Sequence, residues 1–140
     1  MDKGYDSHTY EKVGQWFEEH REEMAEDIKR LVRIPSISDP QAETGPFGKA
    51  CRDAMDEMLA MGRKYGFFSE KKDWDNTIGL WNHLDVVPLG EGWDYAPFDP
   101  VVRDGYLIGR GAQDNKGPAV AMLYVMRCIR DLKLDMKHEI

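Results

Sequence analysis

The sequence predicts an α/β fold in which helices pack on a mixed, mostly parallel sheet. Apolar residues recur at helical spacing over residues 8–33, 46–65 and 118–132. Residues 77–87 are mostly apolar or β-prone and end before a proline, which is typical of a strand. Residues 101–108 place an Asp-Gly pair between two β-prone runs, the pattern of a hairpin turn.

We expect residues 8–33 to form one long helix that ends at Ile34-Pro35, because the residue before a proline disfavours helical angles. An acidic run in this helix indicates either a cation site or a solvated face. Acidic residues this dense usually face water. We therefore expect a solvated face, made of Glu18, Glu19, Glu22, Glu23, Glu26 and Asp27.

The second helix is expected to start near Pro46 and to end near Tyr65, with Gly66 as a left-handed cap. Cys51 in this helix and Cys128 in the third helix both fall on predicted apolar faces. We expect two buried thiols rather than a disulfide or a metal pair, since reduced buried cysteines are usual in cytosolic proteins.

Composition excludes several classes of protein. The chain has 140 residues, enough for one domain with a core of its own, and 41% of them are hydrophobic. The net charge of −7 and the lack of a basic tract argue against a nucleic-acid partner. No apolar run approaches a membrane span, and the N-terminal sequence lacks the apolar core of a signal peptide. A cytoplasmic location without membrane contact is expected.

The strongest candidate site begins at the end of the predicted strand. His83 and Asp85 are two positions apart, so they share one face of that strand. One histidine nitrogen can then bind a metal while the carboxylate takes the N–H of the other nitrogen. The alternative is an ordinary histidine at a strand end beside a surface carboxylate, and His-x-Asp alone favours this alternative.

Asp114 is the second candidate. It follows the glycine-containing run Gly109-Arg110-Gly111 and lies just ahead of the third helix, whose start Gly117-Pro118 indicates. Helix N-terminal amides favour a carboxylate there, and such a carboxylate can bridge two cations at the end of a strand. A plain helix cap is the alternative.

Taken together, the two motifs resemble a known family. HLDVVPLGEGW, followed by PF, DG and GRGAQDNKGP, is similar to the pattern of the co-catalytic zinc metallopeptidases. That family includes Xaa-His dipeptidases, carnosinases, aminoacylases and succinyl-diaminopimelate desuccinylases, and the motifs most resemble the bacterial Xaa-His dipeptidase branch. The resemblance implies a zinc-aminopeptidase-like catalytic domain. It also implies that His83 binds one metal, that Asp114 bridges two, and that Asp85 is the catalytic residue orienting His83.

The resemblance further implies metal-dependent hydrolysis, by a hydrolase of the dipeptidase type, of a peptide or amide bond in a small peptide or an N-acyl amino acid. Two divalent cations would form the complete site. Zinc suits histidine and carboxylate ligands, and manganese and cobalt are alternatives, because carboxylate-rich sites do not select metals by affinity alone.

The chain departs from the family pattern in two places. About a dozen residues, roughly a strand and its turn, are missing between Asn76 and Thr77. Residues 1–140 are expected to be the N-terminal portion of a single, truncated catalytic domain, because the lid domain and the C-terminal half, with the family's general base, have no counterpart. The alternative function is therefore a catalytically incomplete fragment that at most binds metal or a partner. It would be prone to self-association through open sheet edges.

Two further groups flank the candidate site. Trp93, Tyr95 and Phe98 lie in a loop after the predicted strand, where they either line a substrate cleft or anchor the loop. Arg110 and Lys116 lie on either side of Asp114 and are expected to neutralise nearby carboxylates, without a catalytic role.

Overall fold

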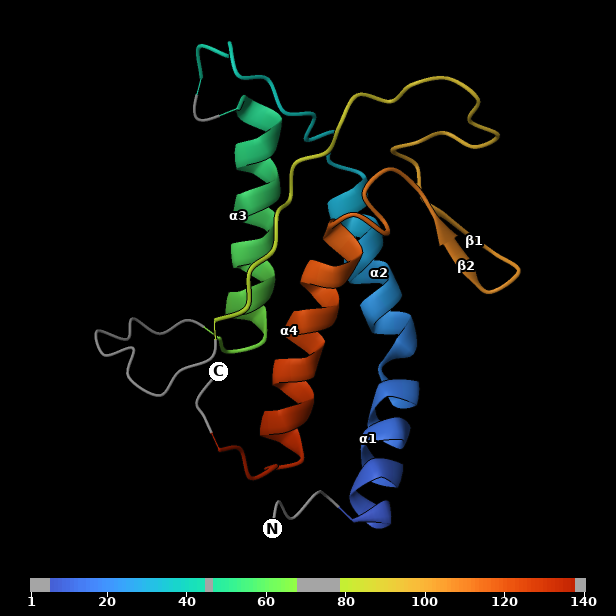
Figure 1. Ribbon diagram of the computed structural model, residues 1–140, viewed down its shortest axis with the longest axis vertical. Coiled ribbons are helices and arrows are strands. Elements are labelled where there is room, and N and C mark those ends of the chain that lie inside the picture. The colour runs from blue at the N-terminus through green and yellow to red at the C-terminus, as the bar shows by residue number, and fades with distance from the viewer. Residues whose placement is uncertain (1–5, 45–46, 68–78, 138–140) are drawn as a thin grey trace.

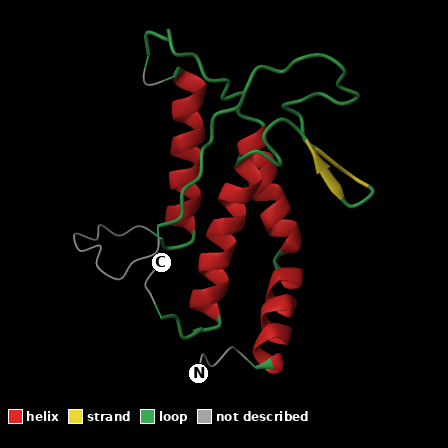
Figure 2. Ribbon diagram, viewed as in Figure 1, coloured by secondary structure: helices red, strands yellow, loops and turns green. Residues whose placement is uncertain are grey.

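A computed structural model of the chain describes residues 6–44, 47–67 and 79–137. Four helices and one hairpin lie within these residues (Figures 1 and 2). In Figure 1, α4 lies between α3 and the α1–α2 pair, and the hairpin projects beside the start of α4. The elements are α1 (Ser7–Glu19), α2 (Arg21–Val32), α3 (Lys49–Lys64), β1 (Val101–Arg103), β2 (Tyr106–Ile108) and α4 (Lys116–Asp131).

The single helix predicted over residues 8–33 is divided at His20, which caps the end of α1 and the start of α2. The His20 ring stacks on Trp16 with centroids 3.9 Å apart, and its Nδ1 lies 2.7 Å from the Trp16 carbonyl oxygen. This local bond competes with the regular helical bonds to the same carbonyl. The prediction of one uninterrupted helix is therefore wrong at this residue.

The end of α3 follows the prediction. Gly66 has a φ of +80°, the left-handed conformation that glycine adopts without a side-chain clash. The amide of Phe67 donates to the Gly62 carbonyl at 2.8 Å, and the amide of Gly66 donates to Arg63 at 3.0 Å. These two bonds are those of a Schellman cap.

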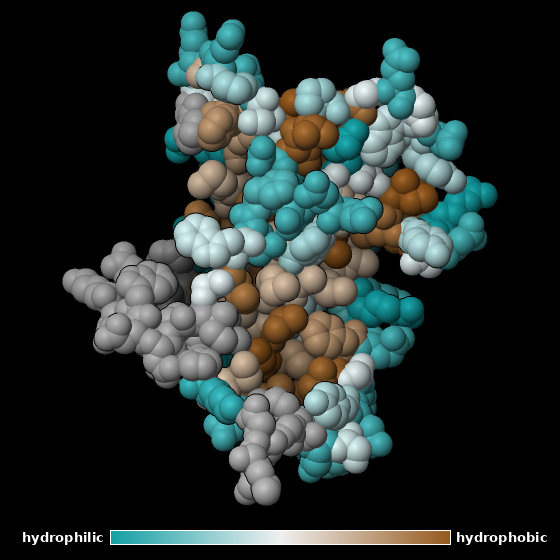
Figure 3. All heavy atoms as spheres, in the orientation of Figure 1, coloured by the Kyte–Doolittle hydropathy of each residue, from teal (hydrophilic) through white to brown (hydrophobic). Residues whose placement is uncertain are grey.

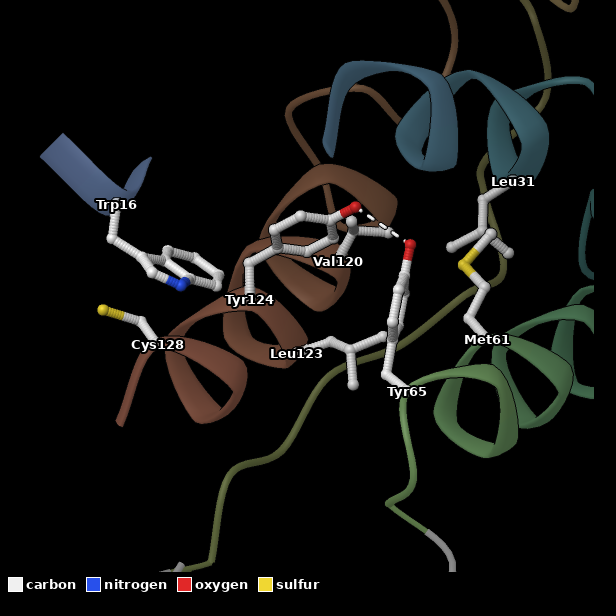
Figure 4. Packing of buried hydrophobic residues seen from close by; sticks show 8 residues of the cluster. All are labelled: Trp16, Leu31, Met61, Tyr65, Val120, Leu123, Tyr124 and Cys128. Carbon is white, nitrogen blue, oxygen red and sulfur yellow. Dashed lines mark hydrogen bonds between the residues drawn. The ribbon is translucent and has the colours of Figure 1, made fainter. Parts of the chain in front are cut away.

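The core forms where α4 meets the other helices (Figure 4). Apolar side chains from α1, α2, α3 and α4 pack there around Tyr124, which is fully buried. Cys51 and Cys128 are both buried and free, as predicted. The buried cluster consists of Trp16, Leu31, Met61, Tyr65, Val120, Leu123, Tyr124 and Cys128.

A polar network runs through this core and corrects the expectation for the acidic run. Asp27 is buried, and its Oδ2 accepts hydrogen bonds from the hydroxyls of Tyr65 at 2.5 Å and Tyr124 at 2.8 Å. Glu23 accepts a bond of 2.9 Å from Arg127, whose guanidinium lies over the Tyr65 ring. These two acids therefore face the core, whereas Glu18, Glu19, Glu22 and Glu26 are exposed, as predicted.

The mostly parallel sheet is not present among the described residues. The one described sheet is the antiparallel pair β1–β2, which confirms the predicted hairpin. Of the strand predicted over residues 77–87, residues 79–87 are described, and they form a single parallel bridge between Val86 and Ile37. A strand persists only beside a hydrogen-bonded neighbour, and within the described part of the chain the neighbour here is limited to Ser36–Ser38.

Residues 79–85 instead run as an extended segment along α3 and α4 (Figure 1). Leu84 packs against the core, and a shallow apolar groove of about 250 Å³ lies between the segment and the helices. Figure 3 shows apolar side chains gathered on the face that contains α4. The shortening predicted after Asn76 lies outside the described residues.

The described helices include none that is both long enough and apolar enough to cross a membrane.

Candidate metal centre

Two segments that are distant in sequence meet at the candidate site. The first contains His83 and Asp85 and is held at Val86. The Val86 amide donates to the Ser36 carbonyl at 2.8 Å, and the Val86 carbonyl accepts from the Ser38 amide at 3.2 Å. The hydroxyl of Ser36 also donates to the Leu84 carbonyl at 2.6 Å. Hydrogen bonds on both sides of Asp85 thus fix the backbone from which the two candidate side chains project.

The second segment leads from β2 into α4, and its glycines allow close packing. Gly111 has a φ of +88°, and a Cβ there would lie 2.9 Å from the Val86 side chain. At Gly117, a Cβ would lie 1.9 Å from the Ala112 carbonyl oxygen. A larger residue at Gly111 would push the second segment away from Val86, and one at Gly117 would distort the turn that contains Asp114.

Lys116 fixes the start of α4 from within the protein. Its side chain is fully buried, and Nζ donates to the carbonyls of Leu31 at 3.0 Å and Ile34 at 2.6 Å, at the end of α2. Burial lowers the pKa of Lys116 to about 8, because the charged form loses its water. Lys116 therefore ties α4 to α2.

The site residues are in direct contact. His83 Nε2 lies 3.1 Å from Asp114 Oδ1, and His83 Nδ1 lies 3.3 Å from Asp85 Oδ1 and 3.2 Å from the Asp85 carbonyl oxygen. The side chains of His83, Asp85 and Asp114 are 51%, 44% and 84% exposed. The Asp114–Asn115 peptide bond is cis. The structure thus brings the three predicted residues together, and their roles stay predictions.

The spacing of His83 and Asp114 fits a shared cation. Two ligands about 2.1 Å from one tetrahedral cation lie roughly 3.4 Å apart, so a separation of 3.1 Å requires little rearrangement. Imidazole nitrogen and carboxylate oxygen are both donors that zinc accepts. In the described part of the chain, no group of three or more His, Cys, Asp or Glu side chains is placed to hold a metal ion.

A cavity of about 280 Å³ opens at the site. It lies between the two segments and is open to solvent, and both His83 and Asp114 line it. Its lining residues are His83, Asp85, Val86, Val87, Trp93, Gly109, Arg110, Gly111, Gln113 and Asp114.

Arg110 anchors the loop beside this cavity. Its Nη2 donates to the Leu89 carbonyl at 2.6 Å, and its guanidinium lies 4.9 Å from the centre of the Trp93 ring. Trp93 Nε1 donates to the same carbonyl at 2.8 Å. The expectation that Arg110 and Lys116 neutralise nearby carboxylates is wrong, since both donate to backbone carbonyls in the contacts described. Trp93 both anchors its loop and lines the cavity.

A second cavity, shallow and open to solvent, measures about 540 Å³ and lies on the hairpin side of the site. Trp93, Gly109 and Gln113 line both cavities. The remaining residues around it are Tyr95, Arg103, Asp104, Tyr106, Leu107, Ile108 and Ala112. Phe98 lines neither cavity and is partly buried.

Sequence reasoning missed the contribution of Gln113 to both cavities and of Lys116 to the helix packing. A lone glutamine carries no pattern of its own. Lys116 had a signal, because its place before Gly117-Pro118 puts it in the first turn of a helix, where a lysine is opposed by the helix dipole and needs another reason to be there.

Part of the chain matches a peptidase family, and most of it is similar to several staphylococcal proteins. Residues 79–140 match the sequence profile of Peptidase family M20/M25/M40. A "Putative dipeptidase" of Staphylococcus epidermidis is 37% identical over 134 residues, covering 87% of this chain and 29% of that protein. "Putative dipeptidase" proteins of Staphylococcus haemolyticus and Staphylococcus aureus are 35% and 33% identical over 135 residues, covering 88% of this chain and 29% of each protein.

Residues 79–140 are thus similar to Peptidase family M20/M25/M40, and most of the chain is similar to proteins named as putative dipeptidases. The matched residues 79–140 include both segments of the candidate centre. The chain spans less than a third of the length of these curated relatives.

Proposed function

We propose that this chain carries one side of the metal centre of a two-metal dipeptidase, which hydrolyses a peptide or amide bond in dipeptides or N-acyl amino acids. One observation carries the proposal: His83 Nε2 and Asp114 Oδ1 lie 3.1 Å apart at a shared cavity, with Asp85 against the other histidine nitrogen. The similarity to proteins named as dipeptidases supports the choice of substrate class. We also propose that the chain belongs to the Xaa-His dipeptidase branch, which its motifs most resemble.

Each of the three residues has a distinct role in the proposed centre. His83 is a terminal ligand through Nε2, and Asp114 bridges two cations from the start of α4. Asp85 is a positioning residue. Its carboxylate accepts the Nδ1 proton of His83, which leaves the Nε2 lone pair free for a cation shared with Asp114.

Zinc is the proposed metal, with manganese and cobalt as alternatives. When bound, the cations polarise the carbonyl of the scissile bond and lower the pKa of a water molecule to near neutrality. The protein contributes the position of the ligands and a cavity that receives the carbonyl. Of the carboxylates in this cavity, Asp114 is proposed as a ligand and Asp85 faces His83, so neither is free to take a proton from water.

A second candidate function follows from the same geometry. Two metal ligands can be assigned among the described residues, and no group of three or more His, Cys, Asp or Glu side chains converges there. A zinc site normally has at least three protein ligands. The 140-residue chain by itself would then bind a metal ion weakly, or associate with a partner or a second copy, without turning over a substrate.

Calorimetric titration of the chain with zinc tests the proposed centre. We expect a dissociation constant in the micromolar range or weaker, and loss of binding in both His83→Ala and Asp114→Asn. His8→Ala is the matched control, because His8 is an exposed histidine of α1. Binding that survives in His83→Ala or in Asp114→Asn would contradict the assignment of ligands.

A further inference from the structure

The cavity on the hairpin side of the candidate centre has a chemistry of its own. It measures about 540 Å³, against about 280 Å³ for the cavity at His83 and Asp114. Because Trp93, Gly109 and Gln113 line both, the two spaces share a wall. The larger cavity therefore lies directly beside the candidate centre.

The walls of the larger cavity are mainly aromatic and aliphatic. Tyr95, Leu107 and Ile108 are partly buried there, whereas Tyr106 at the start of β2 is 73% exposed. The charged residues lie at the hairpin turn. Because the Tyr106 ring is exposed, it is available to a ligand. Apolar walls with few polar groups are typical of small-molecule sites.

The shared wall is held in place before any ligand arrives. Trp93 is fixed at its nitrogen by the bond to the Leu89 carbonyl and at its face by the Arg110 guanidinium. Arg110 is itself tied to that carbonyl at 2.6 Å. A wall fixed in this way loses little freedom when a side chain packs on it, and this favours binding.

We propose that the hairpin-side cavity, lined by Trp93, Tyr95, Tyr106, Leu107 and Ile108, is a subsite for an apolar side chain, preferentially aromatic, next to the scissile amide. The inference rests on the proposed function, which places that amide at His83 and Asp114. It predicts that substrates with an aromatic side chain bind better than the same substrates without one.

Binding to the 140-residue chain tests this without any need for turnover. The probes are N-acetyl-L-phenylalanine and N-acetylglycine, which share an amide and a carboxylate and differ in the ring. The readout is the indole N–H resonance of Trp93 in nitrogen-15-labelled protein, identified among the four tryptophans by its loss in Trp93→Phe. We expect a saturable shift with N-acetyl-L-phenylalanine and none with N-acetylglycine at the same concentrations.

Two variants test the wall itself. Tyr106→Thr removes the ring and keeps a residue suited to strands, and it should weaken binding of N-acetyl-L-phenylalanine by about three- to ten-fold. Tyr95→Ala should also weaken it, and serves if the hairpin is disturbed in Tyr106→Thr. Tyr10→Ala is the matched control, since Tyr10 is a 64% exposed tyrosine of α1, and it should leave the affinity unchanged.

The outcomes separate this inference from the proposed function. Equal shifts with both probes, or full affinity in both Tyr106→Thr and Tyr95→Ala, would overturn the subsite even if zinc binds through His83. If His83→Ala does not change zinc binding and the preference for the ring persists, the metal centre is wrong and the apolar subsite stands.

Discussion

His83 Nε2 lies 3.1 Å from Asp114 Oδ1 across 31 positions of sequence. The contact joins the extended segment over the α3–α4 face to the start of α4. Neither side chain is buried, so burial does not force them together. Their approach depends on the packing of Gly111 against Val86 and of Lys116 against the end of α2.

Removing the Asp85 carboxylate should weaken zinc binding without abolishing it. Asp85 Oδ1 contacts His83 Nδ1 at 3.3 Å, and the loss of such an orienting group typically costs 10- to 100-fold in metal affinity. Asp85→Ala should show a loss of about this size in calorimetric titration. Asp56→Ala, which removes an exposed carboxylate of α3, should show none. Equal affinities in the Asp85 and Asp56 variants would argue that Asp85 does not orient His83.

The 140-residue chain should not hydrolyse dipeptides or N-acyl amino acids. General-base catalysis contributes about 10²–10⁴ in rate, and the carboxylates at the cavity are Asp85 and Asp114, both with other proposed roles. The measurement is release of free amino acid from several such substrates with excess zinc, manganese or cobalt. Metal-dependent turnover that disappears in Asp114→Ala would show that the base lies within this chain.

Substitution of Gly117 by alanine should destabilise the protein, whereas the same substitution at Gly14 should not. In Gly117→Ala the new Cβ would meet the Ala112 carbonyl oxygen at 1.9 Å, so we expect a loss of stability of about 1–3 kcal/mol. Zinc binding should weaken as well, because Asp114 lies in the turn that must shift. In Gly14→Ala, with open space at α1, stability should rise by about 0.5–1 kcal/mol. Urea denaturation measures the stability of both variants. An unchanged stability in Gly117→Ala would contradict the close approach of Gly117 to the Ala112 carbonyl oxygen.

Loss of the Tyr124 hydroxyl should destabilise the core. Asp27 is buried and accepts bonds from Tyr65 and Tyr124, so Tyr124→Phe removes one hydrogen bond to a charged acceptor. Such a bond is worth about 1.5–3 kcal/mol. Tyr106→Phe, the same change at an exposed position, should alter the free energy of unfolding by less than about 0.5 kcal/mol. Equal changes in the free energy of unfolding of the two variants, measured by urea denaturation, would mean that the hydrogen bond from Tyr124 to Asp27 does not stabilise the fold.

The stabilisation by Tyr124 should depend on pH in the alkaline range. Burial, followed by the hydrogen bonds with Tyr65 and Asp27, raises the pKa of Tyr124 above its ordinary value. The contribution is therefore complete below the unfolded pKa of about 10. It is lost as pH rises further, because the unfolded chain then releases a proton that the folded chain retains. The difference in unfolding free energy between wild type and Tyr124→Phe should shrink above about pH 10. If that difference in unfolding free energy stays constant from pH 8 to 11, the predicted pH dependence is wrong.

The sequence by itself determined the local elements. Helical periodicity identified α3 and α4, Gly66 predicted the cap of α3, and Asp104-Gly105 predicted the hairpin. The motifs around His83 and Asp114 also identified the residues that meet at the candidate centre. These features depend on backbone preferences and side-chain spacing within a few positions, which are written in the sequence itself.

Tertiary structure alone decided the rest. Residues 79–85 are β-prone, yet a strand requires a neighbour, and in the described part of the chain they lie over helices with a bridge at Val86. Asp27 is buried because Tyr65, which follows α3, and Tyr124 of α4 donate hydrogen bonds to it. Lys116 is buried because backbone carbonyls at the end of α2 accept its hydrogen bonds. Such partners come from distant parts of the chain. Since a side chain is buried or exposed according to what packs against it, its own position in the sequence could not predict this.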